Sequence, residues 1–412
     1  MNKKKIFVSH SGRQHVHQLL YGLQQHDFSY HFFTSFWYKP SQFPFTLLSL
    51  LPTNLREKII KQFKKRSFDK LDSANITIFP WFEFVREIAD KIFSYSISEY
   101  FLFWRDRIHD TWAASKLSSN YSVVVGYEEC CLRTFRKAKK LGHTTVLDLA
   151  QIHYKEIEAI SLQFPVFSEI YTNKNLRTRI NNIKAEELDL ADYIICLSTF
   201  AKDSLLKHGI PPSKIQVVNL GFDPEKFIPK NNYNIDSQKK LKLVFAGTLT
   251  KRKGLDQLFR LLDDFPIEIE LCIIGAIADA GEMFNEYKSR IQWYPYLEQQ
   301  EMNKVFNDSD VFIFPSYLDS WAMVVVEAMA CGLPVLVSEN TGAKDAVHES
   351  CGEILPVGNY KELKEKIAYI ILHKEYITKK GQASVVQVMQ YKWQNYYLQI
   401  ASFFEKLSNH GK

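Results

Sequence analysis

The sequence lacks the features of a disulfide-stabilised or zinc-binding protein. Its 412 residues contain six cysteines, and no pair has the C-x-x-C spacing. That spacing is typical of structural zinc sites and redox motifs, and disulfide frameworks are typical of small secreted domains. Several of the cysteines lie inside apolar strand or helix patterns. We therefore interpret them as reduced core residues of a protein that stays inside the cell.

Long apolar runs are also missing. No segment approaches the roughly 18 uninterrupted apolar residues that a membrane-spanning helix needs. The chain starts with a basic segment, Lys3 to Lys5, but the apolar run after it is too short for a signal peptide. The sequence therefore predicts a cytoplasmic protein, either free or at the inner face of the membrane.

Positive charge is concentrated near the start of the chain. The net charge is +6, and residues 1–75 carry twelve Lys and Arg against four Asp and Glu, a net +8. Residues 55–68 have the period of an amphipathic helix, which is typical of helices that lie on anionic membranes. A solvated charged helix is the alternative interpretation. Nucleic acid is not expected as a partner because no binding motif accompanies the charge. The polar side of this helix carries Lys58, Lys61, Lys64, Lys65 and Arg66.

Short apolar strands alternate with amphipathic helices along the whole chain. This alternation predicts an α/β fold built from doubly wound parallel sheets. A chain of 412 residues predicts two domains of about 200 residues each. The break at Gly209-Ile-Pro-Pro-Ser213 separates a first domain, residues 1–208, from a second, residues 213–388. We expect a strand from Ile215 to Asn219 to begin the second domain.

The most informative stretch runs from Val311 to Val337. An apolar strand over Val311 to Phe314 is followed by a helix over Trp321 to Ala330, with Asp319 and Ser320 predicted as its cap. Open α/β sheets bind ligands at the carboxyl ends of their strands. A helix amino terminus at that edge offers free N–H groups to an anion. The stretch therefore predicts an anion site at the start of this helix.

A second loop supplies cations to the same edge. The predicted strand from Leu241 to Ala246 is followed by a glycine-flanked loop that contains Lys251, Arg252 and Lys253. Cations and free amides that converge on one crevice describe a phosphate or diphosphate site. Asp319 and Glu327 add acceptors that suit sugar or ribose hydroxyls. Together these groups suggest a nucleotide-activated sugar.

Candidates in the first half of the chain have structural alternatives. Gly12, Arg13 and His15 follow the first predicted strand, where a glycine lets the backbone approach a ligand. His153 lies in a later strand-end loop. Gly12 as a simple turn and His153 as a packing histidine remain open. The D-x-D spacing of Asp308 to Asp310 lies at a helix end, where it caps and turns the chain, so we expect no essential metal.

The motifs around Asp319 resemble those of the retaining glycosyltransferases of family 4, the group 1 enzymes. Asp319, seven residues and Glu327, followed by Ala-Met-Ala-Cys-Gly-Leu-Pro-Val, is similar to the family's E-x7-E signature. The specific resemblance covers roughly residues 185 to 360, and the first domain resembles the family more loosely. Further motifs in the family's order are Ala191 to Ser198, Val217 to Asp223, Phe245 to Leu249, Lys253-Gly254 and Asp310 to Ser316.

The resemblance implies an architecture and an activity. It implies the GT-B fold, two Rossmann-like domains facing across a cleft, with a carboxy-terminal helix over residues 389–409 crossing back to the first domain. It implies retaining transfer of a sugar from a nucleotide-diphosphate sugar to a glycan or lipid-linked acceptor, in cell-surface polysaccharide or glycolipid synthesis. No cofactor is expected, because the nucleotide sugar is the substrate. The usual account, front-face attack, needs no protein nucleophile, so the protein positions the substrates and stabilises the leaving diphosphate.

The resemblance also implies roles for individual residues. Lys253 would hold the diphosphate, Asp319 would contact the transferred sugar, and Glu327 would bind the ribose. Gly12, Arg13 and His15 are candidates for an acceptor or phosphate loop, and His153 for a catalytic group. The remaining donor-site candidates are Gly247, Thr248, Ser320, Trp321, Ala322 and Met323.

Three kinds of departure from the family pattern occur, at four positions. Asp319 replaces the first glutamate, and Thr248 stands where the family has an arginine, for which we hypothesise that Arg252 substitutes. Ser320 and Ala322 replace loop glycines. These departures keep a second interpretation open, a non-catalytic GT-B protein that binds nucleotide sugars or acts as a scaffold.

Overall fold

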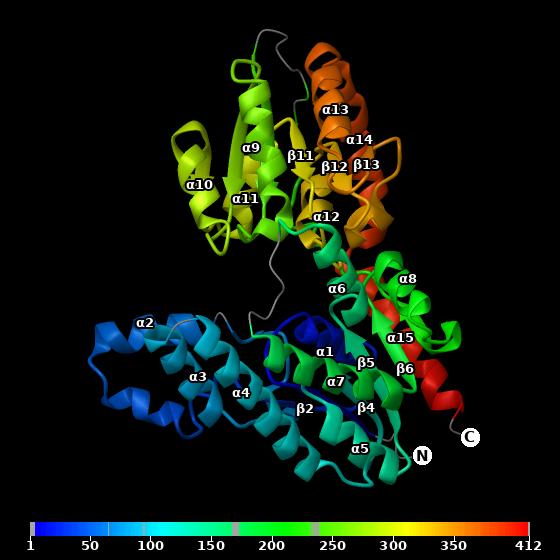
Figure 1. The fold of residues 1–412 in the computed structure, drawn as a ribbon. Helices are drawn as coiled ribbons and strands as arrows, with labels where there is room; N and C mark the ends of the chain where they lie inside the picture. The colour runs from blue at the N-terminus through cyan, green and yellow to red at the C-terminus, as the bar shows by residue number, and fades with distance from the viewer. Residues whose placement is uncertain are drawn as a thin grey trace.

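The computed structural model describes residues 5–64, 66–93, 95–166, 173–231, 233 and 239–410. Two parallel sheets, each flanked by helices, form two domains that face each other (Figure 1). The first sheet has seven strands in the order β3-β2-β1-β4-β5-β6-β7, and the second has six in the order β10-β9-β8-β11-β12-β13. The expected α/β class with two doubly wound sheets is therefore confirmed.

The first sheet is buried on both faces, as its continuous apolar strands require. Phe7 and Val8 at its centre have no exposed surface. Its strands are β1 Lys5–His10, β2 Tyr30–Thr34, β3 Ile76–Ile78, β4 Tyr121–Tyr127, β5 Thr144–Leu149, β6 Tyr193–Cys196 and β7 Ile215–Val217. Its α-helices are α1 Val16–Gln25, α2 Thr53–Lys64, α3 Trp81–Ile92, α4 Tyr95–Lys116, α5 Leu132–Lys140, α6 Tyr154–Gln163, α7 Lys174–Leu190 and α8 Thr199–Lys207, with 3-10 turns η1 Phe45–Leu50, η2 Ser73–Asn75 and η3 Pro212–Lys214.

The first domain extends beyond its expected end at residue 208. β7 pairs in parallel with β6, Ile194 opposite Ile215 and Cys196 opposite Val217. The strand expected to begin the second domain is therefore the edge strand of the first sheet. The Gly-Ile-Pro-Pro break that suggested a boundary is only the turn between α8 and β7, because β7 pairs with the preceding strand of the first sheet.

The second sheet begins after the segment that follows β7. Its strands are β8 Leu241–Ala246, β9 Ile269–Ile274, β10 Gln292–Tyr294, β11 Val311–Phe314, β12 Val335–Ser338 and β13 Gly352–Leu355. Its helices are α9 Leu255–Asp264, α10 Gly281–Tyr287, α11 Gln299–Asn307, α12 Met323–Ala330, α13 Tyr360–Leu372 and α14 Glu375–Val388, with 3-10 turns η4 Lys251–Lys253, η5 Lys288–Arg290, η6 Gly342–Ala346 and η7 Met389–Tyr391. Residues 232 and 234–238, in the segment between β7 and β8, lie outside the described residues.

The chain crosses between the domains twice, first after β7 and again just before the last helix. These two crossings contact each other. Phe222 donates its N–H to the Tyr391 carbonyl at 2.9 Å, and Trp393 donates to the Phe222 carbonyl at 3.3 Å. The last helix, α15 (Trp393–His410), then packs along α1, where Tyr397 contacts Tyr21 with ring centres 5.3 Å apart. The chain therefore ends on the domain in which it began (Figure 1).

The segment between β2 and β4 is a long insertion that extends the first domain to one side. It comprises η1, α2, η2, β3, α3 and α4, and α2 and α3 lie at its outer end (Figure 1). All six cysteines are buried and unpaired, as expected. None of the helices in the described part of the chain combines the length and apolarity that crossing a bilayer requires.

Candidate functional site

A cleft of about 500 Å³ lies between the two domains. It is lined by the loops that follow β1 and β5 of the first sheet and β8 and β11 of the second. These are the carboxyl ends of the strands, where open α/β sheets bind ligands. The lining residues are Gln14, His15, Gln18, Ala150, Gln151, Leu197, Leu220, Ala246, Gly247, Lys253, Phe314, Asp319, Ser320, Trp321, Ala322, Met323, Val324 and Trp393.

Lys253 and Asp319 form an ion pair on the second-domain wall of this cleft. Lys253 ends the turn η4, and the next residue, Gly254, has a left-handed φ of 73°. A Cβ at Gly254 would lie 2.1 Å from the Pro315 carbonyl oxygen, so only glycine lets η4 approach the end of β11 so closely. The Lys253 ammonium also lies 4.9 Å from the centre of the Phe314 ring. The packing therefore holds the cation in place.

The pair is shielded but still borders the cleft. The side chains of Lys253 and Asp319 are 12% and 14% exposed. Burial acts to raise the pKa of Asp319, but Lys253 and Arg252 outweigh it and lower the pKa overall. Asp319 is therefore an anion at neutral pH. A cation and an acceptor side by side suit the charged and hydroxylated halves of a nucleotide sugar.

The loop after Asp319 differs from the expected helix start. α12 begins at Met323 and not at Trp321. Asp319 does not cap it, since its Oδ1 accepts from the Trp321 N–H at 3.1 Å in a local turn. Ala322 precedes the helix with a left-handed φ of 63°. The Trp321 amide is therefore already bonded, and the free helical amides at the cleft start from Met323.

Trp321 is a packing residue as well as part of the cleft wall. It is 2% exposed, and its ring centre lies 5.8 Å from that of Tyr391 in the second crossing. Gly247 lines the cleft at the end of β8. Of the donor-site candidates, the structure therefore brings together Gly247, Lys253, Asp319 and residues 320–323.

Ser320 connects the two domains. Its Oγ donates to the Ala150 carbonyl at 2.6 Å, and its own carbonyl accepts from Ser198 Oγ at 2.8 Å. Nearby, the Asp345 carboxylate accepts from the Thr199 N–H at 2.7 Å, at the start of α8. The second domain therefore holds its loop 319–323 against the carboxyl edge of the first sheet.

Glu327 lies on α12, behind the cleft lining. It is 5% exposed, and burial raises its pKa to about 7 although Lys226 acts in the opposite direction. A carboxyl group near its pKa at neutral pH can both donate and accept hydrogen bonds. The geometry does not place Glu327 among the residues that line the cleft.

On the opposite wall, His15 is held by a buried aspartate. His15 Nε2 lies 2.8 Å from Asp148 Oδ1, and Asp148, in β5, has no exposed surface. The second carboxylate oxygen, Oδ2, has no hydrogen-bond partner in the described structure. The Asp148 bond fixes the orientation of a ring that borders the cleft. His15 is therefore a pre-oriented imidazole on the first-domain wall of the cleft.

His153, expected as a catalytic candidate, has a structural position instead. It is the N-cap of α6, where Nδ1 accepts from the Lys155 N–H at 3.2 Å. Its ring stacks on those of Tyr154 and His208. Burial, with His208 and Lys155 adding to it, lowers its pKa to about 4. His153 does not line the cleft, so its strand-end position reflects helix capping.

Four further candidates lie outside the lining of the cleft. These are Gly12, Arg13, Thr248 and Arg252. Gly12 donates its N–H to His10 Nδ1 at 2.8 Å, which is a turn contact. Arg252 accepts the Tyr317 N–H at its carbonyl, and its charge acts on Asp319 from nearby. Arg252 therefore supports the electrostatics of the pair without bordering the cleft.

The sequence did not single out several residues that complete the site. Gln14 and Gln18 flank His15 at the start of α1, Asp148 holds it, and Trp393 comes from the last helix. Gln14 and Gln18 are four residues apart, a helical spacing that could have indicated a shared face. Asp148 and Trp393 had no such signal, because only the tertiary fold brings them to His15 and the cleft.

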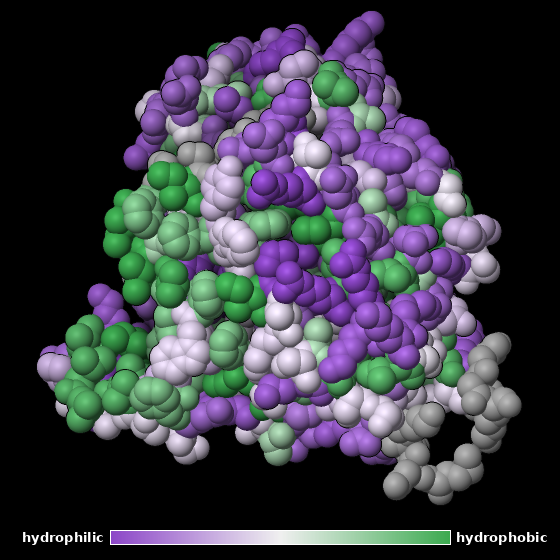
Figure 2. Space-filling view, turned by 60° about the horizontal axis from the view of Figure 1, so that its bottom comes forward, coloured by the Kyte–Doolittle hydropathy of each residue, from purple (hydrophilic) through white to green (hydrophobic). Residues whose placement is uncertain are grey.

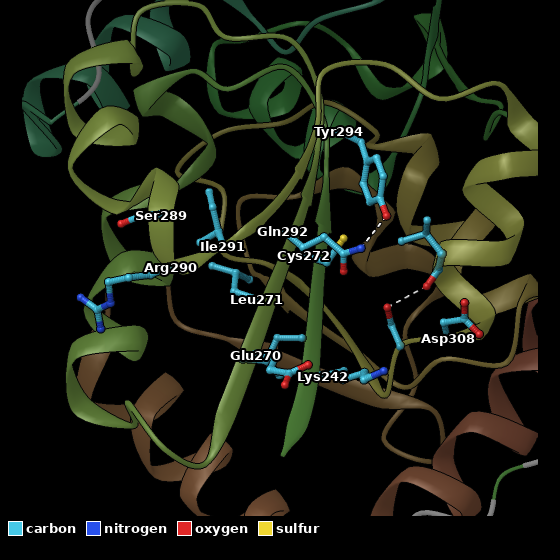
Figure 3. A pocket seen from close by; sticks show the side chains of 13 residues that line it. Lys242, Glu270, Leu271, Cys272, Ser289, Arg290, Ile291, Gln292, Tyr294 and Asp308 are labelled. Atoms are coloured by element: carbon cyan, nitrogen blue, oxygen red, sulfur yellow. Dashed lines mark hydrogen bonds between the residues drawn. The ribbon is translucent and has the colours of Figure 1, made fainter. Parts of the chain in front are cut away.

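A second pocket, of about 460 Å³, lies away from this site. Its lining includes Lys242, Glu270 and Gln292, from the amino-terminal halves of β8, β9 and β10, beside α11 (Figure 3). Arg290 and Asp308 lie at opposite ends of the view. Its charged side chains do not converge, and it opens at the strand ends where such sheets do not bind ligands. The cleft is therefore the better candidate.

Comparison with known proteins finds a family match in the second domain. The family model described as group 1 glycosyl transferases matches residues 229–384. The amylovoran biosynthesis glycosyltransferase AmsK of Erwinia amylovora is 26% identical over 246 residues, covering 53% of this chain and 57% of that protein. The D-inositol 3-phosphate glycosyltransferase of Streptomyces bingchenggensis is 28% identical, over 41% and 42% of the two chains. The chain thus spans about half the length of these relatives.

Solved structures share the whole architecture. Sucrose-phosphate synthase from Thermosynechococcus elongatus superposes with a TM-score of 0.64 at 16% identity, over 98% of this chain and 99% of that one. HepE of Anabaena in complex with UDP-glucose superposes with a TM-score of 0.63 at 13% identity, over 98% and 99%. The chain therefore has the GT-B fold, and the relatives support a relationship to the group 1 glycosyltransferases.

Proposed function

We propose that the protein is a retaining glycosyltransferase of family 4, which transfers a sugar from a nucleotide-diphosphate sugar to a glycan or lipid-linked acceptor. The observation that carries this proposal is the Lys253–Asp319 pair, which borders the same cleft as the oriented His15 of the facing domain. The family match covers the donor half, and relatives act in polysaccharide biosynthesis.

The roles follow from the chemistry at each wall. Lys253 and the first free amides of α12 stabilise the departing diphosphate, and Asp319 accepts from hydroxyls of the transferred sugar. Glu327, one helix turn past the first amides of α12, binds the ribose. His15 orients the acceptor hydroxyl. The leaving phosphate accepts the hydroxyl proton, so no protein nucleophile is required, and no metal is required either.

Among the described residues that line the cleft, Asp319 is the only carboxylate, and Lys253 neutralises it. A neutralised carboxylate is a poor base or nucleophile, which favours retention through front-face attack. The test is the anomeric configuration of the first-formed product, followed by NMR. A product of inverted configuration would contradict the retaining mechanism and would assign the His15–Asp148 pair as the acceptor base.

Donor binding is tested first, with a thermal-shift screen of nucleotide sugars that begins with UDP-glucose, since UDP-glucose occupies HepE. A ligand at 100 times its Kd adds about 2.7 kcal/mol to the free energy of unfolding. Donor hydrolysis without acceptor then separates the two functional classes. Donor binding with neither hydrolysis nor transfer, and no effect of Lys253→Ala, would instead assign a non-catalytic sugar-nucleotide-binding protein.

A further inference from the structure

The outer face of α3 is apolar and faces solvent. Trp81, Val85, Ile88 and Ile92 follow one another at helical spacing, and Ile88 and Ile92 are 58% and 68% exposed. An amphipathic helix on a protein surface normally turns this stripe toward the core. On α3 the opposite side faces inward and carries the buried residues Glu83 and Ala89. Within the described chain, Ile88 and Ile92 of this stripe are therefore largely uncovered.

The stripe continues onto the neighbouring elements. Phe43 contacts Trp81 with ring centres 5.5 Å apart, and Phe93 at the end of α3 stacks with Phe101 of α4 at 5.7 Å. The space-filling view shows hydrophobic side chains gathered on the side of the molecule where the insertion between β2 and β4 lies (Figure 2). We call this surface the apolar face. It comprises Phe43, Leu47, Leu50, Leu55, Trp81, Val85, Ile88, Ile92, Phe93, Ile97, Tyr100 and Trp104.

A basic helix borders the apolar face. Phe63 of α2 packs on Phe45 and Phe84 of the same unit, with ring centres 5.7 and 6.5 Å away. This packing leaves lysines of α2 exposed, together with a single acidic side chain, Glu57. The exposed lysines are Lys58, Lys61 and Lys64.

The acidic residues of α3 do not offset these lysines. Glu83 is 1% exposed and is held by Arg66, Arg86 and Arg105. Glu87 pairs with Arg66 and Arg86, and Asp90 pairs with Arg86. The rim of the apolar face therefore carries net positive charge. The sequence placed Arg66 among the lipid-facing cations, but it lies beyond α2 and is structural; Lys65 lies outside the described residues.

We propose that the apolar face inserts into the interfacial layer of an anionic lipid bilayer, with the α2 lysines on the headgroups. The aromatic residues Trp81, Tyr100 and Trp104 have an apolar body and a polar tip, which suits the boundary between headgroups and acyl chains. Protein interfaces are depleted of lysine, which argues against a second copy as the occupant. Helices of this kind bury their apolar side about 5–10 Å deep without spanning the bilayer.

One helix, α4, joins this surface to the carboxyl end of β1, the strand that precedes His15. The first half of α4 carries Ile97, Tyr100 and Trp104, whereas its second half bonds the carboxyl end of β1. Ser11 Oγ donates to Asp106 Oδ1 at 2.6 Å, and Ser9 Oγ lies 3.0 Å from His109 Nε2. Docking through the apolar face therefore holds the acceptor-side domain at the membrane, as a lipid-linked acceptor requires. This last step rests on the proposed function.

The test is sedimentation of the full chain with vesicles of phosphatidylcholine, with and without phosphatidylglycerol. We expect binding to the anionic vesicles, and at least about a tenfold loss of partitioning in Ile88→Glu/Ile92→Glu and in Lys58→Glu/Lys61→Glu/Lys64→Glu. Salt should weaken wild-type binding. The control, Leu372→Glu/Val386→Glu, changes two residues that are 78% and 77% exposed on α13 and α14, and should bind as the wild type does.

The depth of insertion into the bilayer and the folded state of each variant are measured on the same proteins. Brominated lipids should quench the tryptophan fluorescence of the wild type, and Trp81→Phe/Trp104→Phe should lose most of that quenching. Unchanged vesicle binding in the Ile88/Ile92 variant would overturn the proposal. So would a wild-type dimer in light scattering that this variant converts to a monomer while it still binds vesicles. Thermal unfolding confirms that each variant is folded.

Donor hydrolysis separates this proposal from the proposed function. None of the substituted residues lines the cleft, so hydrolysis should be equal in all variants. Loss of vesicle binding with hydrolysis intact supports the docking surface. A wild type that binds vesicles but never turns over a donor leaves the docking surface standing and removes the enzymatic function.

Discussion

Lys253 and Asp319, 66 residues apart in the sequence, meet as an ion pair at the wall of the interdomain cleft. Each comes from a loop at the carboxyl end of a strand of the second sheet, and Gly254 allows the two loops to approach. Neither side chain is free in the absence of ligand. A donor that binds here must therefore compete for, or share, a cation that already has a partner.

Replacing Lys253 tests its role in stabilising the leaving group. Removal of one such donor costs about 2.7–4 kcal/mol of transition-state binding, so Lys253→Ala should lower kcat for donor turnover by about 10²–10³-fold. Lys251→Ala is the matched control, because Lys251 lies in the same turn, outside the cleft lining, and should cost little. Steady-state kinetics on both variants measures the difference.

A stability effect must be kept apart from this kinetic one. Lys253→Ala leaves the Asp319 carboxylate without its partner, which is destabilising in a shielded position. Lys253→Met/Asp319→Asn removes both charges and keeps the volume. If that double variant folds as the wild type does and keeps full turnover, the pair has no catalytic role. Arg252→Ala with unchanged turnover would likewise refute Arg252 as the substitute for the missing arginine.

Glu327 should make the folding stability depend on pH. Its pKa is about 7 in the folded protein, above the 4.5 of an exposed glutamate, so the folded state binds more protons between these values. The free energy of unfolding therefore falls as pH rises from about 4.5 to 7, by up to about 1.4 kcal/mol per pH unit from this group. Glu327→Gln should remove that slope in urea titrations at several pH values.

Glu187 provides the comparison for this experiment. Burial raises its pKa to about 8, despite hydrogen bonds from the amides of Cys131 and Glu129. Glu187 is still present in Glu327→Gln. The free energy of unfolding of that variant should therefore still fall with rising pH, and this fall should extend to a higher pH than the one caused by Glu327. Parallel curves for the wild type and Glu327→Gln would mean that Glu327 has an ordinary pKa in the folded protein.

Ala322 occupies a backbone position that suits glycine. Its φ of 63° and ψ of 71° are left-handed, which costs an L residue about 1–2 kcal/mol. Ala322→Gly removes this strain but gains flexibility in the unfolded chain, so we expect a net stabilisation of about 0.5–1 kcal/mol. Ala383→Gly, in the right-handed helix α14, should instead destabilise by about 1 kcal/mol. Chemical denaturation measures both, and destabilisation by Ala322→Gly would contradict the strain.

The sequence predicted the parts of the fold that depend on local pattern. Apolar runs such as Val311 to Phe314 appeared as strands, and the motif residues Lys253 and Asp319 were correctly expected to lie close together. The pattern did not locate the start of α12, because the left-handed φ of Ala322 depends on contacts made by the loop. Nor did it assign β7 to the first sheet, because the Gly-Ile-Pro-Pro break hid its pairing with the preceding strand β6, which is a tertiary contact.

The first-domain side of the site was the least predictable. His15 was a candidate, but the buried Asp148 that orients it lies 133 residues away and resembles any strand aspartate in the sequence. His153 was an equally plausible candidate by position, since both histidines follow a strand. The two differ only in their tertiary surroundings: one ring borders the cleft and the other caps α6.

The two histidines therefore make a paired experiment on the proposed acceptor side. His15→Ala removes a cleft group that orients the acceptor hydroxyl and should lower kcat with an acceptor by about 10²-fold, the order of loss that a misplaced reacting group causes. Asp148→Asn keeps His15 but weakens its orientation, so it should show a smaller loss of kcat and little change in the KM for the donor. His153→Asn replaces one capping side chain by another and should keep both kcat and stability. Equal losses in His15→Ala and His153→Asn would mean that neither histidine acts through the cleft.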